Sequence, residues 1–190
     1  MHHRDRHFRR RSSDDPGHSH GLTFSCYRQF RFLEAERTCL WLADPIETAR
    51  RRWEFDLWAY VFMPEHVHLI VRSRNPDSPI AAILKAVKQP VGRRAFLHLE
   101  AEAPHWLPRL SRERNGRVER LFWQPGGGYD RNLVEPRALA AAISYVHQNP
   151  VRRGLVDRPP DWRWSSAGWY ESEPRNDLRP DLIPPEWCTG

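Results

Sequence analysis

The sequence has 190 residues, three cysteines and a formal net charge of +6, and its pI is near 9.7. This length suits one compact domain with tails, and a basic chain has nucleic acid as its default partner. Cys26, Cys39 and Cys188 are odd in number and widely spaced, which excludes a disulfide framework and a zinc knuckle. No apolar run reaches the roughly 18 residues that span a bilayer. We therefore expect a cytoplasmic protein in a reducing environment, with no membrane association.

Composition divides the chain into three parts. Residues 1–20 are rich in arginine and histidine and poor in apolar side chains, which predicts a disordered basic arm. Residues 21–166 carry regular hydrophobic patterns and are predicted to form a single domain. Residues 167–190 form a Pro-rich, mildly acidic tail. The sequence leaves open whether this tail folds back on the domain or stays mobile.

Hydrophobic periodicity predicts the elements in chain order. Alternating apolar and aromatic residues predict strands at 22–30, 55–63, 67–72 and 121–124. Apolar residues at helical spacing predict helices at 34–53, from residue 80 onward and at 135–148. Prolines predict an interruption near Asp44–Pro45, a break or kink at Pro90 and a helix end at Asn149–Pro150. The Arg-rich stretch 107–120 is predicted to be a mobile loop, and glycines 126–128 a flexible turn.

A His-x-His pair begins the third predicted strand. Pro64–Glu65 forms the predicted turn of a hairpin, and His66 and His68 then point to the same face because side chains alternate along a strand. Two imidazoles on a rigid strand can hold one metal ion and leave positions open for a substrate. The alternative is a histidine pair that binds no metal. A second pair, His18 and His20, lies in the predicted arm.

The helix predicted at 135–148 carries an apolar stripe, made of Leu139, Ile143 and Val146. Tyr145 lies about 100 degrees or more from the middle of that stripe, and Asn149 lies over it one turn later. Small residues share that side (Ala138, Ala141 and Ala142), so a ligand could approach the tyrosine. The alternative is a half-exposed structural tyrosine.

The helix predicted from residue 80 onward carries a basic set, Lys85, Lys88, Arg93 and Arg94. We interpret this set as a contact with the phosphates of DNA, and an ordinary solvated helix face is the alternative. In a complex with unpaired DNA, Trp123 or Trp106 could stack on bases.

Two histidines, a tyrosine and an asparagine together suggest phosphodiester cleavage. This reaction needs a Lewis acid on a non-bridging phosphate oxygen and a nucleophile held in line. A phenol forms a covalent phosphate ester. That ester conserves the energy of the broken bond, so rejoining the strand needs no ATP.

Four separated motifs carry a resemblance to a known family. They read MPEHVHL at 63–69, FWQ at 122–124, YVHQNPV at 145–151 followed by GLV at 154–156, and DWRWSS at 161–166. In this order the motifs resemble those of the REP-associated tyrosine transposases, which are relatives of the single-strand transposases in the HUH-endonuclease group. The resemblance covers about residues 22–166.

The resemblance implies an α+β fold of ferredoxin-like or HUH-endonuclease type, with an antiparallel sheet of about four strands and helices packed on it. It implies that His66 and His68 hold Mg²⁺ or Mn²⁺, with Asn149 at the position of a third, polar ligand. Two imidazoles favour Mn²⁺ by softness. By motif position Tyr145 is the nucleophile that leaves a 5′-phosphotyrosine on single-stranded, hairpin-forming DNA. Relatives include monomers and dimers that exchange this helix, so either state is open.

Three alternatives remain at this point. Tyr129, beside the glycines, is a rival nucleophile on a predicted loop, whereas His147 lies about 200 degrees around the helix from Tyr145 and receives no catalytic role. A zinc hydrolase would use His66, His68 and a third protein ligand to activate water. A non-catalytic protein derived from a transposase would bind hairpin DNA without cutting it.

Overall fold

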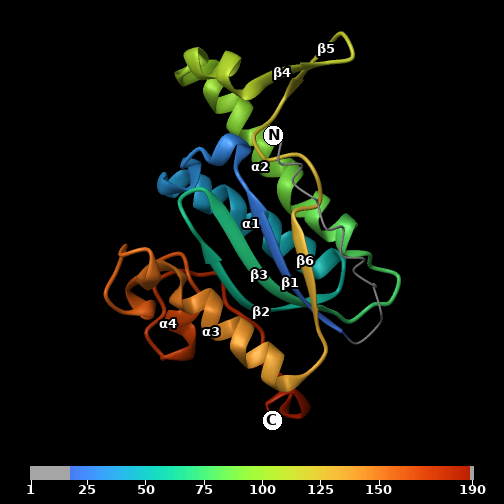
Figure 1. Cartoon of the computed structure of the whole chain (residues 1–190), viewed down its shortest axis with the longest axis vertical. Coiled ribbons are helices and arrows are strands. Elements are labelled where there is room, and N and C mark those ends of the chain that lie inside the picture. The colour runs from blue at the N-terminus through green and yellow to red at the C-terminus, as the bar shows by residue number, and fades with distance from the viewer. Residues whose placement is uncertain (1–17, 189–190) are drawn as a thin grey trace, which may run out of the picture.

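The computed structural model describes residues 18–188 and contains a four-stranded antiparallel sheet (Figure 1). The strand order is β2-β3-β1-β6. The strands are β1 (Ser19–Ser25), β2 (Phe55–Phe62), β3 (His66–Ser73) and β6 (Tyr129–Leu133). A separate two-stranded sheet pairs β4 (Ser111–Arg114) with β5 (Arg117–Arg120). The predicted fold class is therefore confirmed.

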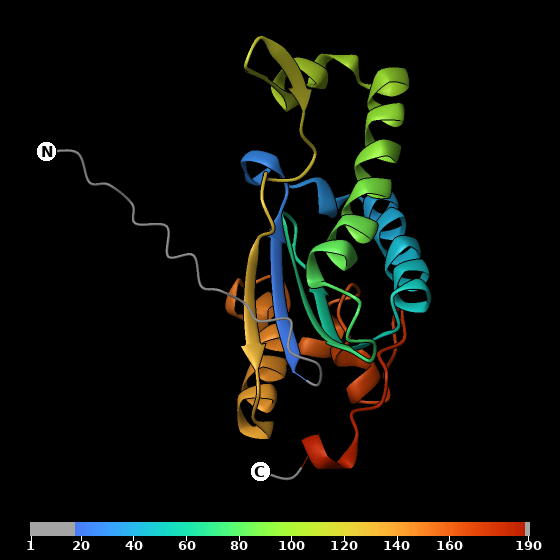
Figure 2. The same ribbon diagram turned by 90° about the vertical axis from the view of Figure 1, so that its right-hand side faces the viewer.

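Helices cover both faces of the four-stranded sheet (Figure 2). The long helices α1 (Glu36–Arg52) and α2 (Ile80–Glu102) pack together on one face. The helix α3 (Pro136–Arg152) packs on the opposite face, and the short helix α4 (Ala167–Tyr170) follows near its end. Five short 3₁₀ turns complete the regular structure: Tyr27–Gln29, Phe32–Glu34, Pro104–Leu110, Pro159–Asp161 and Pro185–Trp187.

The alternation along β3 divides its side chains between the two faces, as predicted. Val67 and Leu69 belong to the core cluster that the sheet forms with α1 and α2. Ile70 belongs instead to the cluster that the sheet forms with α3. His66 and His68 have the same parity as Ile70, so they face α3. The sheet thereby presents both imidazoles to the helix that carries Tyr145.

The helices tolerate prolines better than we predicted. The helix α1 runs without interruption through Pro45, and α2 runs unbroken through Pro90. The prediction that Asn149–Pro150 ends the third long helix is wrong, because α3 continues to Arg152. A proline costs one backbone hydrogen bond, and at Pro150 this loss falls in the last turn. The helix ends at Arg152, and Gly154 follows with a φ of 64°, which lets Leu155 N donate to Pro150 O at 2.9 Å.

The fourth strand is not where we predicted it. Residues 121–124 make only an isolated bridge between Cys26 and Trp123, and the strand that pairs with β1 begins at Tyr129. The glycines just before it bring the chain against β1. A Cβ on Gly128 would lie 2.1 Å from the carbonyl oxygen of Thr23, and φ there is 78°. Only glycine fits so close an approach at position 128, whereas a Cβ on Gly126 or Gly127 would meet nothing within 4 Å.

The Arg-rich stretch is also more ordered than we predicted. The stretch 107–120 contains the end of a 3₁₀ turn and the whole β4–β5 hairpin. Asn115 and Gly116 connect the two strands with φ values of 51° and 71°. Positive φ at both central residues defines a tight two-residue turn for which Asn-Gly is preferred. The local sequence therefore specifies a hairpin.

The C-terminal segment, residues 164–188, packs on β2, which is an edge strand of the sheet. Phe62 N donates to Trp164 O at 2.8 Å, and Asp181 N donates to Leu57 O at 2.8 Å. Leu178 is buried in the core. At the other terminus, most of the predicted basic arm lies outside the described residues, and β1 begins at Ser19. Among the helices of residues 18–188, none is long and apolar enough to cross a membrane.

Candidate active site

The two histidines converge on one point at the start of β3. Nε2 of His66 and Nε2 of His68 lie 3.0 Å apart, and their ring centroids are 4.7 Å apart. Two cis ligands at about 2.1 Å from one octahedral ion lie about 3.0 Å from each other. The spacing of these nitrogens therefore fits the shared coordination of a single cation.

The opposite nitrogen of each ring has its own partner. Nδ1 of His66 lies 3.0 Å from Oε1 of Glu65, and Nδ1 of His68 lies 2.7 Å from Oγ1 of Thr23. When each Nδ1 carries the proton and donates it to these oxygens, both Nε2 lone pairs are free to bind a metal. Glu65 and Thr23 are thus the residues that orient the pair.

Burial keeps both imidazoles neutral. It lowers the pKa of His66, and it lowers the pKa of His68 to about 4, with help from the positive charge of Arg152. Burial alone raises the pKa of Glu65, but hydrogen bonds from Arg153 and His66 outweigh it, so the pKa lies below its usual range. At neutral pH the site therefore holds a carboxylate behind two neutral imidazoles, which is the protonation state that a metal requires.

Helix α3 brings Tyr145 to the same place within the same chain. Its ring centroid lies 5.7 Å from that of His68, edge to face, and the side chain is 50% exposed. The guanidinium of Arg152 lies 4.1 Å from the centroid of the Tyr145 ring and donates a hydrogen bond to the Tyr145 carbonyl at 2.8 Å. The phenol is therefore held beside the imidazoles while remaining open to a ligand.

Asn149 follows one helical turn later and is only 7% exposed. Its Nδ2 donates to the carbonyl of Tyr145 at 3.4 Å, and its Oδ1 accepts no hydrogen bond from the residues described. On the next turn Arg153 donates to Oε1 of Glu65 at 2.8 Å. This ion pair ties the end of α3 to the start of β3. The amide oxygen is the donor on this helix that suits a hard cation.

A cleft of about 390 Å³ opens between the sheet and α3. His68 and Tyr145 line it together with the small side chains of Ala138, Ala141 and Ala142. Tyr129 lines the same cleft from β6 and is 51% exposed. The rival phenol thus reaches the cleft as well, on a strand instead of the predicted loop.

The predicted DNA-binding residues lie on the other face of the sheet, along α2. Lys85, Lys88 and Arg93 line a groove of about 660 Å³, and Arg94 pairs with Asp44 at 2.9 Å. Burial lowers the pKa of Lys88, whose Nζ donates to the carbonyl of Gly126 at 3.1 Å. The structure does not bring this set to the histidines.

Trp123 belongs to the core. It is 7% exposed, its ring packs edge-on against Phe24 at 5.0 Å, and its Nε1 donates to the Lys88 carbonyl at 2.9 Å. Trp123 also lines the groove along α2, and its stacking on unpaired bases stays a prediction. An aromatic residue at a strand-like position is typical of both a core and a binding surface.

His147 and His20 each lie within hydrogen-bonding distance of another side chain. His147 Nε2 lies 2.8 Å from the Ser166 hydroxyl, and burial lowers the pKa of His147 to about 4. His20 is buried between β1 and β6, where its Nδ1 lies 3.0 Å from Asp130. Among residues 18–188, no cluster of three or more His, Cys, Asp or Glu side chains could hold a metal ion. Asn149, whose amide oxygen is a ligand of another type, is therefore the candidate third protein ligand for a site built on His66 and His68.

Sequence reasoning missed Thr23, Glu65, Arg152 and Arg153. Two signals were available. Glu65 precedes the first histidine directly, and Arg153 follows Asn149 by four residues, which places it on the same face of the helix. Thr23 had no such signal, because only the pairing register of β1 with β3 sets Thr23 opposite His68.

Comparisons with known proteins identify a class of fold first. No family model matches the chain. The solved structure of a REP-associated tyrosine transposase bound to a REP hairpin superimposes with a TM-score of 0.67 at 18% identity, covering 95% of this chain and 93% of that one. The chain therefore has the fold of a tyrosine transposase.

Sequence comparison then finds two similar curated proteins. A Haemophilus influenzae protein named as a REP-associated tyrosine transposase is 23% identical over 166 residues, which cover 83% of this chain and 85% of that protein. The REP-associated tyrosine transposase of Escherichia coli is 24% identical over 147 residues, covering 77% and 71%. The predicted resemblance is thus confirmed: over most of its length this chain is similar to REP-associated tyrosine transposases.

Proposed function

We propose that the protein is a transposase or endonuclease that cuts and rejoins hairpin-forming single-stranded DNA. Tyr145 is the nucleophile, and His66, His68 and Asn149 hold Mg²⁺ or Mn²⁺. The observation that carries this proposal is the 5.7 Å separation of the Tyr145 and His68 rings, on the side where the two Nε2 atoms meet at 3.0 Å. When bound, the cation supplies a Lewis acid for a non-bridging oxygen of the scissile phosphate.

The side chains of the site carry out the other steps of the proposed reaction. The Tyr145 oxygen forms a bond to phosphorus as the bond to the 3′ oxygen breaks, which leaves a 5′-phosphotyrosine and a free 3′-OH. The phenol gives up its proton to solvent, to which it is half exposed, and the departing 3′ oxygen takes up a proton. Arg152 packs against the ring and limits its motion. Attack by a 3′-OH on the phosphotyrosine reverses these steps and reseals the strand.

The cleft provides the approach for the substrate. The alanines of α3 that line the cleft have small side chains beside the tyrosine. An extended DNA strand can therefore reach the phenol without moving the helix. The solved neighbour is bound to a REP hairpin, and we propose a hairpin substrate for this chain too. The basic charge of +6 supports a partner that is a polyanion.

The proposal is tested by incubating the protein with a hairpin oligonucleotide that carries single-stranded flanks, in Mn²⁺ or Mg²⁺, and running a denaturing gel. We expect a covalent protein–DNA band that disappears with a chelator and in Tyr145→Phe. Tyr129→Phe is the matched control and should keep the band. Hairpin binding without a band in either metal would indicate a non-catalytic binder. Tightly bound zinc with hydrolysis and no band would indicate a zinc hydrolase.

A further inference from the structure

The β4–β5 hairpin stands clear of the sheet, beyond the end of α2 (Figures 1 and 2). We call residues 111–120 the ribbon. Apart from the pairing of its two strands, its contacts lie at its base, with the 3₁₀ turn Pro104–Leu110 and, through Arg120, with Glu100 and Phe96 of α2. The Asn115–Gly116 turn fixes the register, so the ribbon presents its side chains in a defined order.

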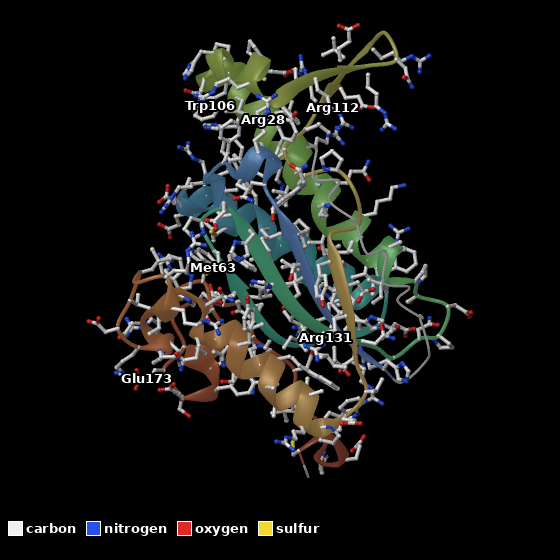
Figure 3. The ribbon with its side chains drawn as sticks, in the orientation of Figure 1. Arg28, Met63, Trp106, Arg112, Arg131 and Glu173 are labelled. Atoms are coloured by element: carbon white, nitrogen blue, oxygen red, sulfur yellow. The ribbon has the colours of Figure 1, made fainter. Side chains whose placement is uncertain are left out.

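The two faces of the ribbon differ in charge. Cross-strand pairing sets Arg112 opposite Glu119 and Arg114 opposite Arg117, and residues directly opposite share a face. One face therefore carries three arginines and one glutamate. The other face is neutral, with Ser111, Glu113, Val118 and Arg120. Figure 3 shows Arg112 on this projecting element.

Two of these arginines have no counter-charge. Arg112 forms an ion pair with Glu119 at 2.7 Å. Arg114 and Arg117 are both exposed, and neither has an ion-pair or hydrogen-bond partner among the described residues. Like charges directly opposite each other destabilise an antiparallel pair. An anionic ligand at the tip of the ribbon would relieve this repulsion.

The base of the ribbon is linked to the start of β3 through Cys26 and Tyr27, which follow β1. Leu121 N donates to Leu110 O at 2.7 Å, and Tyr27 N donates to Phe122 O at 2.8 Å. The neighbouring Cys26 N donates to Glu65 O at 2.8 Å, next to His66. The ribbon thus rises from the same end of the sheet as the imidazole pair. Arg28 and Trp106 lie at this end too (Figure 3).

We propose that the ribbon grips the double-stranded stem of a DNA hairpin, with Arg114 and Arg117 on its phosphates, while the single-stranded flank runs to the cleft. This inference rests on the proposed function, because it names the surface that would hold the stem. A two-stranded ribbon fits the major groove, which is about 12 Å wide. Unpaired DNA is usually bound through stacking on aromatic side chains, and the ribbon has none.

The test compares the wild type with Arg114→Ala/Arg117→Ala by fluorescence anisotropy. The two probes are a hairpin and an unpaired strand of the same length. We expect the affinity for the hairpin to fall at least about tenfold, and the slope of log K against log salt to shrink by about 2, one for each phosphate that an arginine no longer neutralises. Affinity for the unpaired strand should change by less than about twofold. The variant should fold, because it removes a repulsion.

Two variants serve as controls for Arg114→Ala/Arg117→Ala. Arg51→Ala/Arg52→Ala removes the same charge from exposed positions at the end of α1, and Val118→Ala alters an exposed residue on the neutral face of the ribbon. Both should bind the hairpin like the wild type. The inference is wrong if Arg114→Ala/Arg117→Ala binds the hairpin normally, or if both probes weaken equally.

Anisotropy and covalent-band formation separate the two proposals. A wild type that forms no covalent band, but whose hairpin binding depends on Arg114 and Arg117, would contradict the chemistry and leave the ribbon assignment standing. A wild type that forms the band, with hairpin binding indifferent to these arginines, would contradict the ribbon assignment alone.

Discussion

Each imidazole of the His66–His68 pair makes a hydrogen bond through Nδ1 and points Nε2 at the other ring. The bond to Glu65 is itself anchored by Arg153, which donates to the same carboxylate oxygen at 2.8 Å. Removing such an outer partner typically weakens metal binding by about 10- to 100-fold. In the proposed metal site, the residues behind the histidines would therefore set the affinity of the pair for the cation.

We expect Arg153→Ala to weaken Mn²⁺ binding about tenfold in calorimetric titrations, because Glu65 loses the group that holds it against His66. Arg158→Ala is the control, since Arg158 pairs with Glu171 and Glu173 in the C-terminal part of the fold. It should bind Mn²⁺ as the wild type does. Equal affinities for all three proteins would contradict the role of the Glu65–Arg153 pair.

The lowered pKa of His147 makes the free energy of unfolding depend on pH. Burial lowers the pKa of His147 to about 4 in the folded protein, against about 6.5 in the unfolded chain. Between these values the unfolded state binds the proton more readily, so stability is complete above pH about 6.5 and falls as the pH drops towards 4. The loss of stability from this residue is at most about 3.5 kcal/mol.

Urea unfolding at a series of pH values checks this expectation. The free energy of unfolding of the wild type should fall more steeply with acidification than that of His147→Gln, which cannot take up the proton. Parallel pH profiles for the two proteins would show that His147 is readily protonated in the folded state.

At the level of single elements, α3 supplies Tyr145, Asn149 and Arg152 of the site, and Arg153 follows directly at its C-cap. Its cleft side is lined by small residues next to Tyr145. Because Ala141 is exposed and lines the cleft, a larger side chain there narrows the approach to the phenol without disturbing the core.

We expect Ala141→Leu to slow covalent-band formation at least about tenfold while leaving the melting temperature nearly unchanged, since exposed substitutions usually alter stability by less than about 0.5 kcal/mol. Ala140→Leu is matched on the same helix, where Ala140 faces the C-terminal segment instead. It should keep the wild-type rate. Equal rates for the two variants would show that the substrate does not pass through the cleft.

The elements show why part of this site could be predicted and part could not. Alternation along a strand has a fixed period, so it placed His66 and His68 together. Helical spacing likewise put Asn149 over Tyr145. The fourth strand could not be placed, because it depends on the close approach of Gly128 to Thr23, which no local pattern encodes. The ribbon was missed because its strands lack an apolar face, although Asn115–Gly116 was a usable turn signal.

At the scale of the whole molecule, the C-terminal segment completes the domain. Hydrogen bonds from 164–166 and from Asp181 cover the outer edge of β2, where an open strand would otherwise invite aggregation. The Tyr60 hydroxyl donates to the carbonyl of Leu178 at 2.5 Å. Leu178 is 3% exposed, whereas Leu182 is 87% exposed. The same segment therefore contains one core leucine and one surface leucine.

We expect Leu178→Ala to lower the free energy of unfolding by about 2 to 4 kcal/mol, the usual cost of a cavity at a buried leucine. Leu182→Ala should change it by less than about 0.5 kcal/mol. Urea titrations of both variants provide the comparison. A small effect at both positions would mean that the segment is only loosely attached to the domain.

In the proposed reaction Tyr145, and not Tyr129, attacks DNA beside the paired histidines. The most direct measurement is to form the covalent complex in Mn²⁺, digest the protein and the DNA, and find the nucleotide-bearing peptide by mass spectrometry. We predict that the modified residue is Tyr145. A nucleotide on Tyr129, or on any residue outside α3, would rule out Tyr145 as the nucleophile.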